Sequence, residues 1–249
     1  MAAVTLIGSP VSPYVRKVLA ACAIKGLEVE LDPISPMYGN DDFERISPLR
    51  RVPVWIEGDL VLCDSSVIVQ YIEETRPGPS LWPADPARRA KARWLEEFAD
   101  TRLFDVLGWR LFFQIALKPR FFGTEADPEV VEKARDVELP QILDYLESQT
   151  PETGFLFGEL SMADLSVAPA FLNARAVQIN VDPERWPRLA AWLERMNEQT
   201  PLGPLNKLAR NLMRTPLAAH RDRLTEFGLA PASRSWMGEA ARRGPMTPQ

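Results

Sequence analysis

The sequence contains few of the side chains that bind metals or act as catalytic bases. Its 249 residues include one histidine, His220, and two cysteines, Cys22 and Cys63, which lie far apart in the chain. This set is too small for a zinc finger, an iron–sulfur site or a CxxC redox pair, so we expect no metal site. A Ser-His-Asp triad would have to use His220. Two unpaired thiols are typical of a reducing, cytoplasmic setting.

The sequence also lacks long hydrophobic segments and an excess of positive charge. Nowhere do about 18 apolar residues follow one another, so we expect no membrane span. Residues 1–9 hold no basic segment followed by a long apolar one, so we expect no signal peptide. The 29 Lys and Arg residues against 34 Asp and Glu residues give a net charge of -5. This charge provides no general attraction for nucleic acid, which we therefore do not expect as a partner.

What the sequence does have is an ordinary globular composition with an unusual amount of proline. The chain is 46% hydrophobic and 25% charged, and it is long enough for one large domain or two smaller ones. Proline accounts for 23 residues, or about 9% against roughly 5% in average proteins. Four of these prolines lie in the segment RPGPSLWPADP at residues 76–86, which we predict to be an interdomain linker.

Before the linker, the pattern predicts a small α/β layer with the order βαβ and then ββα. Strands are predicted at residues 4–7, 27–31, 54–57 and 60–63. Helices are predicted at residues 12–26, 42–46 and 65–75. The first two strands should be parallel because a helix connects them. The last two should form a hairpin, because Gly58 and Asp59 are typical turn residues.

Beyond the linker, the chain changes to long helical patterns. Helices are predicted at residues 87–117, 128–148, 161–176, 187–198 and 205–213. Pro140 is expected to kink the second of them.

The pattern divides the chain into an α+β domain, a linker, an all-α domain and a basic extension. The boundaries that we predict are residues 1–76, 77–86, 87–204 and 205–249. The extension carries eight Lys and Arg residues and three Asp and Glu residues. Its final part, residues 230–249, is rich in Pro, Ser and Gly, so we expect it to be partly disordered.

Ser12-Pro13-Tyr14 is the first motif that bears on function, because it joins the first predicted strand to the first predicted helix. A serine at this position is an ordinary helix N-cap. The position also suits thiol chemistry, because a hydroxyl donor and the unsatisfied N–H groups at a helix N-terminus favour a thiolate over a thiol. Ser9 is a rival hydroxyl, but it lies before the helix begins, so Ser12 is the preferred candidate.

Two further motifs lie at the ends of predicted strands. Arg50-Arg51-Val52-Pro53 precedes the third strand, where a proline is usually an edge feature and an arginine is usually solvated. Asp64-Ser65 lies between the fourth strand and the third helix, and alone it is an ordinary capping pair.

Taken together, these motifs resemble the cytosolic glutathione transferases of the serine type, including bacterial ones. The resemblance covers about residues 3–200. It implies an α+β N-terminal thioredoxin-like domain followed by an all-α C-terminal helical domain. In glutaredoxin-like proteins the first motif is Cys-Pro-Tyr-Cys. In serine-type transferases its first cysteine becomes the catalytic serine, which here is Ser12.

The resemblance also implies a glutathione site around the other two motifs. Pro53 is expected to be cis, and Val52 is expected to pair through its main chain with the cysteinyl unit of glutathione. Arg51 is expected to meet a glutathione carboxylate. Ser65 is expected to donate to the γ-glutamyl carboxylate, and Asp64 to accept from the ammonium group. Glutathione is then the co-substrate, the second substrate is a hydrophobic electrophile, the assembly is a homodimer and the role is detoxification.

The second domain contributes a folding motif and a set of aromatic residues. Ser161 and Asp164 have the spacing of a capping box, and Leu160 and Leu165 that of a hydrophobic staple. This motif resembles the family's sixth helix, and its role is folding. Aromatic residues able to receive an electrophile lie in and after the helix that follows the linker: Phe104, Trp109, Phe112, Phe113, Phe121 and Phe122. Any one of them is more often a core or dimer contact, so none is assigned to the site, and Tyr14 and Asp100 are also left unassigned.

The resemblance leaves alternatives open. The same scaffold supports glutathione-dependent isomerases, dehalogenases and ether-cleaving enzymes, although Ser12-Pro13-Tyr14 departs from the Ser-Ser-Cys signature of the zeta-type isomerases. A non-catalytic interaction module is another alternative, but such members typically lose the glutathione-binding residues that are present here.

The basic extension has no single predicted role. Three alternatives are open: the extension is a solvated tail, it contacts an acidic partner, or it covers the partner subunit. The candidate contact residues are Arg210, Arg214, Arg221 and Arg223.

Overall fold

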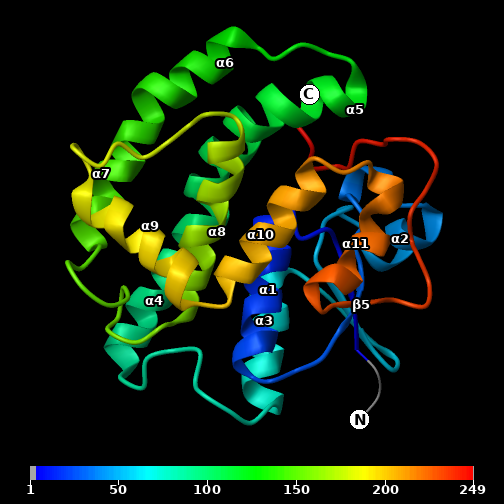
Figure 1. The fold of residues 1–249 in the computed structure, drawn as a ribbon, viewed down its shortest axis with the longest axis horizontal. Coiled ribbons are helices and arrows are strands. Elements are labelled where there is room, and N and C mark those ends of the chain that lie inside the picture. Colours follow the sequence, from blue (N-terminus) through cyan, green and yellow to red (C-terminus); the bar gives the residue numbers. More distant parts are fainter. Residues whose placement is uncertain (1–3, 249) are drawn as a thin grey trace. The chain divides into compact units, whose positions relative to one another are not determined.

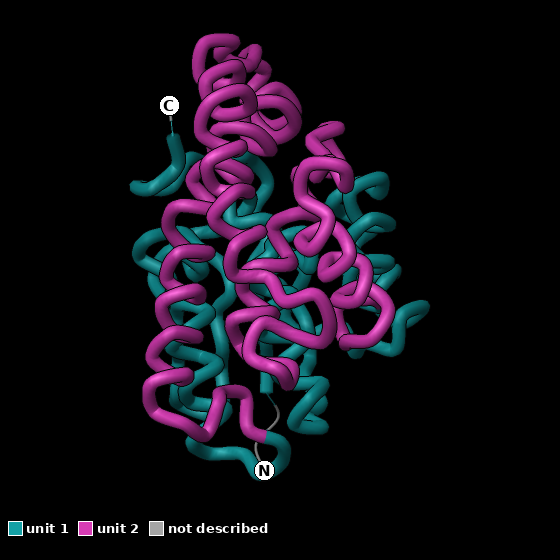
Figure 2. Tube along the Cα trace, turned by 90° about the vertical axis from the view of Figure 1, so that its left-hand side faces the viewer, with its two compact units in different colours: residues 1–79, 204–249 teal, residues 80–203 magenta. Residues whose placement is uncertain are grey.

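A computed structural model of the chain describes residues 4–248. It comprises two compact units, which Figure 2 shows in teal and magenta. The first unit is built from both ends of the chain, Met1–Pro79 and Pro204–Gln249, and the second is the continuous segment Ser80–Gly203. The boundary after Pro79 lies inside the linker segment predicted from the sequence. Among residues 4–248, none of the helices combines the length and the apolar composition that crossing a membrane requires.

A five-stranded mixed sheet lies at the centre of the first unit. Its strands are β1 (Val4–Ile7), β2 (Glu30–Asp32), β3 (Val54–Glu57), β4 (Leu60–Cys63) and β5 (Ala230–Pro231). Their order in the sheet is β4-β3-β1-β2-β5. β1 is parallel to β2 and antiparallel to β3, and β3 and β4 form a hairpin, as the sequence predicts. Gly58 has a φ of 60° in the hairpin turn, a conformation that glycine adopts without strain.

The helices of the N-terminal segment follow the predicted order closely. α1 (Pro13–Ile24) begins with a proline in its first turn and ends before Gly26, which has a φ of 65°. α3 (Ser65–Thr75) has the predicted bounds, and it packs against α1. The 3-10 turn η1 (Pro36–Tyr38) and α2 (Asp41–Ile46) connect β2 to β3. β2 itself is shorter than predicted and begins later, at Glu30.

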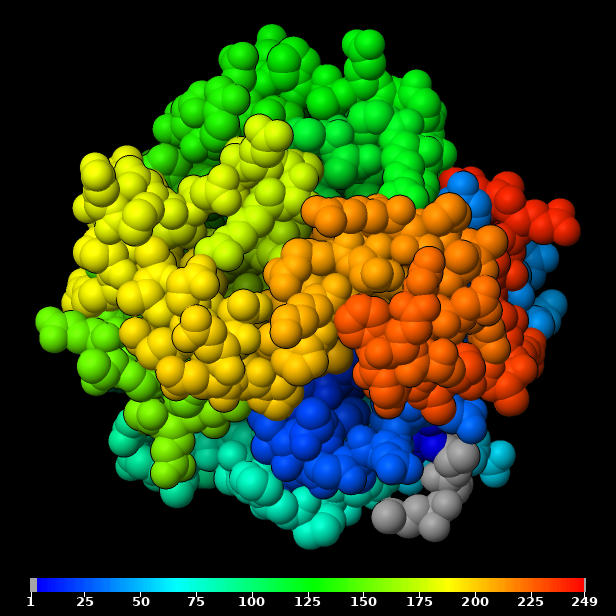
Figure 3. All heavy atoms as spheres, in the orientation of Figure 1, coloured from blue at the N-terminus to red at the C-terminus, as the bar shows by residue number. Residues whose placement is uncertain are grey.

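From Pro204 on, the C-terminal segment belongs to the first unit. It contains most of α10 (Leu202–Met213), followed by η5 (Leu217–Ala219), α11 (His220–Leu224) and η6 (Thr225–Phe227). β5, which is labelled in Figure 1, then adds to β2 as a parallel strand. In Figure 3, atoms of this segment, coloured orange to red, lie against the blue atoms of N-terminal residues.

The expectation of partial disorder from residue 230 on is wrong for residues 230–248. The backbone N–H of Asn40 donates to the carbonyl of Trp236 at 2.9 Å, and that of Arg242 donates to the carbonyl of Met37 at 2.7 Å. These bonds join segments about 200 positions apart in sequence, which is why the local composition does not reveal them. Residues 205–248 are therefore part of the thioredoxin-like unit rather than a solvated extension.

Asp32, at the end of β2, is the main attachment point of the C-terminal segment. Its side chain is fully buried, at 0% exposure. The carboxylate accepts hydrogen bonds from Arg221 Nη1 at 3.0 Å, from Ser235 Oγ at 2.9 Å and from the N–H of Trp236 at 2.8 Å. A buried carboxylate without such partners would be strongly destabilising, so β2 and the C-terminal segment stabilise each other.

The second unit is helical. Its α-helices are α4 (Pro86–Phe98), α5 (Lys118–Phe122), α6 (Pro128–Lys133), α7 (Leu139–Gln149), α8 (Met162–Ala176) and α9 (Pro187–Gln199). Three segments are π-helical: η2 (Ala99–Leu103), η3 (Asp105–Leu117) and η4 (Ala134–Glu138). α8 forms the core, because every residue from Met162 to Ala174 is buried, and α4 and η3 pack against it.

The long helix predicted at residues 128–148 is divided into α6, η4 and α7. Pro140 lies in the first turn of α7, directly after the π-helical segment. Proline has no N–H to donate to the preceding turn. The sequence predicts a kink at Pro140; the structure has a change of helix type just before this residue.

Candidate active site

The predicted site residues of the first unit lie in segments that meet at one edge of the sheet. Ile7 of β1 pairs with Val54 of β3, and Val54 also pairs with Cys63 of β4. The residues that follow β1, precede β3 and follow β4 are therefore placed at the same edge. These segments carry Ser12, Arg51, Val52, Pro53, Asp64 and Ser65.

Ser12 lies at the N-terminus of α1, in the turn that follows β1. Its backbone is extended, with φ -69° and ψ 127°, and its side chain makes no capping hydrogen bond. The Ser12 N–H donates to the carbonyl of Ser9 at 2.9 Å, and its carbonyl accepts from Arg16 at 3.2 Å. Among the residues described, no group is hydrogen-bonded to the Ser12 hydroxyl. The main chain thus fixes a partly exposed hydroxyl at a helix N-terminus, where it can serve a ligand.

The rival hydroxyl, Ser9, has a different environment. Its side chain is buried, and its Oγ accepts a hydrogen bond from the N–H of Val11 at 3.3 Å. Its own N–H donates to the carbonyl of Ile34 at 2.8 Å. Ser9 therefore shapes the turn between β1 and α1, whereas Ser12 is placed at its outer end.

Val52 packs directly against the turn that leads to Ser12. The contact occurs at Gly8, which has a φ of 141°. A Cβ on Gly8 would lie 2.6 Å from Val15 Cγ2 and 2.8 Å from Val52 Cβ, so only glycine fits there. The peptide bond between Val52 and Pro53 is cis, the geometry that the resemblance implied. Sequence analysis missed the role of Gly8, whose signal was a glycine immediately after a buried strand.

Asp64 and Ser65 connect β4 to α3. Asp64 has a φ of 77°, and its Oδ1 accepts from the N–H groups of Ser66 at 2.9 Å and Val67 at 3.3 Å. Asp64 is therefore the N-cap of α3, as the motif alone predicts. Within the described part of the chain, Oδ2 of this exposed carboxylate has no hydrogen bond. Ser65 is the first residue of α3, and its side chain is buried.

Lys17 adds a positive charge beside the N-terminus of α3. Its side chain is 1% exposed, and its Nζ donates to Ser66 Oγ at 2.9 Å. This bond ties α1 to α3 and places the Lys17 ammonium group beside the N-terminus of α3. Sequence analysis did not single out Lys17. Its signal was a pair of basic residues, Arg16-Lys17, within an otherwise apolar helix.

The two arginines that precede Val52 differ in role. Arg50 is buried, and its guanidinium donates to Glu44 Oε2 at 3.0 Å and to the carbonyl of Gly39 at 2.7 Å. Arg51 is exposed, and only its main chain is fixed, by two hydrogen bonds with Ser47 Oγ at 3.0 Å and 2.8 Å. Arg50 is therefore structural, and Arg51 is the arginine whose side chain can reach a ligand.

Arg16 brings a buried cation next to the Ser12 turn. Its Nη1 donates to the carbonyl of Pro10 at 2.9 Å and to that of Val11 at 3.4 Å. Burial, together with the charge of Arg210, lowers the pKa of Arg16 to about 9. Arg16 is therefore still a cation at neutral pH. Through these two hydrogen bonds it stabilises the turn that leads to Ser12.

Neither cysteine is a thiolate at neutral pH. Burial raises the pKa of Cys22 to about 12. The pKa of Cys63 is also raised, by burial and by the charge of Asp64, and its Sγ donates to the carbonyl of Ile46 at 3.0 Å. A sulfur nucleophile at this site would therefore be supplied by a ligand.

His220, the one residue considered for a catalytic triad, has a structural role. His220 is buried, and its Nε2 lies 3.0 Å from the carbonyl oxygen of Leu212 and 3.2 Å from that of Thr215. The imidazole thus holds the end of α10. Among residues 4–248, no group of three or more His, Cys, Asp and Glu side chains is arranged to hold a metal ion.

In the second unit, the aromatic residues considered for the electrophile divide into core and partly exposed rings. Phe112 and Phe113 are buried in the core. Phe104 contacts Trp109 with ring centroids 5.5 Å apart, and Trp109 contacts Phe113 at 5.6 Å. The rings that remain accessible to a ligand are Phe104, Trp109, Phe121 and Phe122. Tyr14 and Asp100 are partly exposed.

These features define a class of protein. The first unit has a thioredoxin-like sheet with a hydroxyl at the start of its first helix, a cis proline before β3 and a capped helix after β4. It is joined to a helical unit. This combination is the architecture of thiol-dependent transferases.

Comparison with known proteins identifies the family. Two family models match the chain: the glutathione S-transferase N-terminal domain over residues 6–80 and the C-terminal domain over residues 128–195. A glutathione S-transferase of Hyoscyamus muticus is 31% identical over 192 residues, covering 74% of this chain and 89% of that protein. A maleylacetoacetate isomerase of Rattus norvegicus is 27% identical over 172 residues, covering 67% and 76%. A solved glutathione S-transferase from Rhodospirillum rubrum F11 has a TM-score of 0.74 at 27% identity, covering 81% and 91%. The chain belongs to the glutathione S-transferase family.

Proposed function

We propose that the protein is a glutathione transferase in which Ser12 stabilises the thiolate of glutathione for attack on a hydrophobic electrophile. The observation that carries this proposal is the Ser12 hydroxyl, which lies at the N-terminus of α1 without a capping bond. A free thiol has a pKa of about 8.5 and is mostly protonated at neutral pH. A hydrogen bond donated to sulfur and the positive end of a helix both favour the anion.

The residues at the same sheet edge are proposed to bind glutathione. Val52 pairs through its main chain with the cysteinyl unit, since its N–H and C=O have no hydrogen bond among the described residues. Ser65, at the start of α3, binds the γ-glutamyl carboxylate with the help of the helix N-terminus and Lys17. Asp64 uses Oδ2 to accept from the glutathione ammonium. Arg51 extends its exposed guanidinium to the other carboxylate.

The proposed reaction is a substitution at carbon. Glutathione loses its thiol proton to solvent, and the sulfur lone pair forms a bond to the electrophilic carbon. The leaving group departs with the electron pair of the bond that breaks. Ser12 donates its hydrogen bond to the thiolate before the attack, so it stabilises the reactive ionisation state of the nucleophile. The proposed second substrate is a hydrophobic electrophile.

Substitution of Ser12 tests this proposal directly. Ser12→Ala should retain glutathione binding but lower kcat by about 10- to 100-fold, the loss expected for a hydrogen bond to a charged group. The pKa of the bound thiol, followed by thiolate absorbance in the ultraviolet, should rise toward that of free glutathione. Ser9→Ala is the matched control and should leave this pKa unchanged. Unchanged turnover in Ser12→Ala would remove Ser12 from the catalytic role.

A glutathione-dependent isomerase is the second candidate, favoured by the similarity to the rat maleylacetoacetate isomerase. In an isomerisation, glutathione adds to the substrate and is released, so the total thiol concentration does not change. A transferase consumes one thiol for each product molecule formed. Titration of free thiol during turnover therefore separates the two reactions. Retention on glutathione resin without turnover of any electrophile would instead indicate a non-catalytic module.

We also propose that the protein is a homodimer. Large apolar side chains are exposed in both units, with Leu49 at 51% and Val67 at 50% in the first unit and Trp94 at 55% in the second. Single exposed apolar side chains are common on monomers, so the dimer proposal rests on the resemblance to the family. Light scattering measures this directly, and the mass of a single chain at micromolar concentration would refute the dimer. A cytoplasmic role in detoxification fits the two unpaired cysteines and the use of glutathione.

A further inference from the structure

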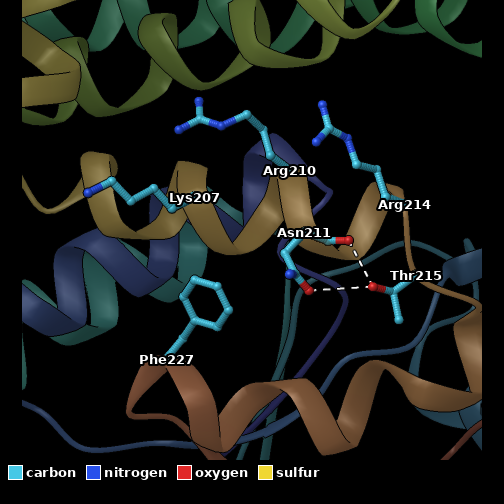
Figure 4. A pocket seen from close by; sticks show the side chains of 6 residues that line it. All are labelled: Lys207, Arg210, Asn211, Arg214, Thr215 and Phe227. Atoms are coloured by element: carbon cyan, nitrogen blue, oxygen red, sulfur yellow. Dashed lines mark hydrogen bonds between the residues drawn. The ribbon is translucent and has the colours of Figure 1, made fainter.

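The C-terminal segment has two parts that differ in their contacts. In the first part, Figure 4 shows the guanidinium groups of Arg210 and Arg214 projecting from the side of α10 opposite Phe227 of η6. Both arginines are exposed, and among the described residues neither forms an ion pair. The second part, residues 236–244, forms a strap. Its main chain is hydrogen-bonded to the connection between β2 and β3, which leads to the proposed glutathione-binding residues.

The strap is attached to η1 and to the residue before α2 by main-chain hydrogen bonds. The N–H of Asn40 donates to the carbonyl of Trp236 at 2.9 Å, and the N–H of Arg242 donates to the carbonyl of Met37 at 2.7 Å. The N–H of Trp236 is itself bonded to the buried carboxylate of Asp32 at 2.8 Å. These bonds satisfy backbone groups of both segments and fix the path of the strap across the connection.

The end of the strap lies directly against the turn that precedes Arg51. A Cβ on Gly244 would lie 3.0 Å from Arg50 Cβ and 3.1 Å from the carbonyl oxygen of Leu49, so the Gly244 main chain is in close contact with both residues. The N–H of Gly244 donates to Thr247 Oγ1 at 3.0 Å, and its carbonyl accepts from the N–H of Thr247 at 3.0 Å. A turn closed by two hydrogen bonds therefore packs on Leu49 and Arg50.

Arg50 has a backbone conformation that its surroundings must hold. Its φ is 49°, in a region that residues with a Cβ rarely occupy. Its N–H donates to the carbonyl of Ser47 at 2.7 Å, and its buried guanidinium donates to the carbonyl of Gly39 at 2.7 Å. Gly39 belongs to the connection that the strap binds. Arg50 is therefore held both by the end of the strap at Gly244 and by the segment to which the strap is attached.

The position of Arg50 determines that of the next two residues. The N–H of Arg51 donates to Ser47 Oγ at 3.0 Å, and its carbonyl accepts from the same hydroxyl at 2.8 Å, so Arg51 belongs to the turn that contains Arg50. Val52 follows directly, one Cα spacing of about 3.8 Å further along the chain. A shift of Arg50 would therefore move the main chain of Val52 and the base of the Arg51 side chain.

We propose that the strap positions Arg51 and Val52 for glutathione, with Gly244 and Arg50 as the positioning residues. The inference rests on the proposed roles of Arg51 and Val52 in binding glutathione. Groups that are held in place before a ligand arrives bind it more tightly, because less ordering cost opposes the interaction. The strap should therefore set the affinity for glutathione. The turnover of bound glutathione should not depend on the strap, because Ser12 lies on a different segment, in the turn after β1.

Substitutions at Gly244 test the inference by separating binding from turnover. Gly244→Val should raise the Kd for glutathione, measured calorimetrically, by about 10-fold, as expected when a hydrogen bond to a charged group is lost. Gly244→Ala should cause a smaller rise. The kcat for 1-chloro-2,4-dinitrobenzene at saturating glutathione should be unchanged in both variants. Gly238→Ala is the matched control in the strap, because a Cβ there would lie at an ordinary 3.4 Å from atoms of Asn40 and Tyr38.

Substitution of Arg50 tests the same contact from the other side. Arg50→Lys keeps the positive charge but cannot reproduce the two bonds that the guanidinium makes to Gly39 and Glu44, so the Kd for glutathione should again rise. Arg45→Lys, which changes an arginine in an exposed ion pair of α2, is the matched control. Arg214→Gln removes a cation from the first part of the C-terminal segment. Both of these variants should leave the Kd unchanged.

Amide hydrogen exchange measures the positioning without glutathione. Peptides that cover residues 47–52 should exchange faster in Gly244→Val than in the original chain, and at the original rate in Gly238→Ala. Equal Kd values in these two variants would overturn the inference, and so would a lower kcat at an unchanged Kd. If neither the original chain nor any variant binds glutathione, the proposed glutathione site is rejected, and faster exchange in Gly244→Val would still support the coupling of the strap to Arg51 and Val52.

Discussion

Asp164 accepts four hydrogen bonds in the core of the helical unit. Its carboxylate is fully buried, and its Oδ2 accepts from the N–H of Ser161 at 3.0 Å and from Ser161 Oγ at 2.8 Å. Oδ1 accepts from the N–H of Leu156 at 2.8 Å and from Trp192 Nε1 at 3.1 Å. Burial raises the pKa of this carboxyl, and the four donors oppose the rise. The residue therefore joins the start of α8 to the preceding loop and to α9.

Replacing Asp164 should destabilise the protein without changing its chemistry. Asp164→Ala leaves four donors without an acceptor, so we expect the free energy of unfolding to fall by about 3 kcal/mol or more. Asp164→Asn keeps one acceptor oxygen and should lose less. Urea denaturation followed by circular dichroism measures both losses, and the pKa of bound glutathione should stay at its original value. An alanine variant as stable as the original chain would contradict this assignment.

At the residue scale, local motifs were predictable and packing partners were not. Ser161 and Asp164 were identified because a capping box lies within four consecutive residues, and it is present in the structure. Trp192 was not identified as a partner, because it is 28 positions away and meets Asp164 only after α9 packs against α8. Gly8 was likewise missed, since its role depends on Val52, which lies on another segment. The structure positions Ser12, Val52 and Ser65 at one edge of the sheet, and their roles toward glutathione remain predictions.

One helix of the second unit is capped by a side chain from another helix. The residue before α9, Trp186, makes no side-chain cap, and Pro187 follows it. Glu147 of α7 accepts from the N–H groups of Arg188 at 3.2 Å and Leu189 at 2.8 Å, and from Arg188 Nε at 3.1 Å. A carboxylate is the favoured group at this end of a helix. Glu147 therefore couples the formation of α9 to that of α7.

This cap should make the stability of the protein depend on pH. Burial alone would raise the pKa of Glu147, but the hydrogen bonds from Leu189 and Arg188 outweigh it and lower the pKa below its ordinary value of 4.5. The folded state then binds fewer protons than the unfolded state. The stabilisation is therefore present above that ordinary pKa and is lost as the pH falls through the lower folded pKa.

Glu147→Gln removes the titrating group. The free energy of unfolding, measured by urea denaturation in a series of acidic buffers, should decrease less steeply with falling pH in this variant than in the original chain. Glu194→Gln removes a carboxylate from an exposed ion pair with Arg175 and serves as the control, because such pairs contribute little. Identical pH dependence in Glu147→Gln and the original chain would show that the cap does not titrate as described.

At the element scale, the bounds of helices and strands were predicted correctly where the hydrophobic periodicity agreed with the turn or capping residues that mark the ends of an element. β3, β4 and α3 have the bounds that the sequence indicates, since turn residues or capping residues mark their ends. The π-helical segments were not predicted, because the apolar spacing of a π-helix is close to that of an α-helix over a few residues. β5 was not predicted either. It has two residues, one of them a proline, and only its pairing with β2 makes it a strand.

The chain as a whole has a charge asymmetry that the structure explains. Residues 205–249 carry a net charge of +5, from eight basic and three acidic residues, so the other 204 residues carry -10. Three arginines of this basic segment form ion pairs with acidic residues of the N-terminal segment, namely Asp32, Asp41 and Asp42. Much of the asymmetry is thus neutralised within one unit, and no acidic partner is needed to account for those arginines.

Breaking the attachment at Asp32 should release the C-terminal segment. Arg221→Ala/Ser235→Ala removes two donors from a fully buried carboxylate, so we expect a loss of about 2–4 kcal/mol in the free energy of unfolding. Limited proteolysis with mass spectrometry should then detect early cleavage between α11 and residue 248. Arg223→Ala, which removes an exposed arginine from the same helix, should stay within about 0.5 kcal/mol of the original chain. A double variant as protease-resistant as that control would contradict the role of Asp32.

The first unit is assembled from both ends of the chain, and this has a consequence for its synthesis. A ribosome releases residues 80–203 before residues 204–249, so the helical unit is available to fold while the sheet still lacks its last strand. During that interval β2 is an unprotected edge, and Asp32 lacks the donors that Arg221, Ser235 and Trp236 later supply. A premature stop codon in the last part of the gene would therefore remove a strand from the N-terminal unit and leave the helical unit complete.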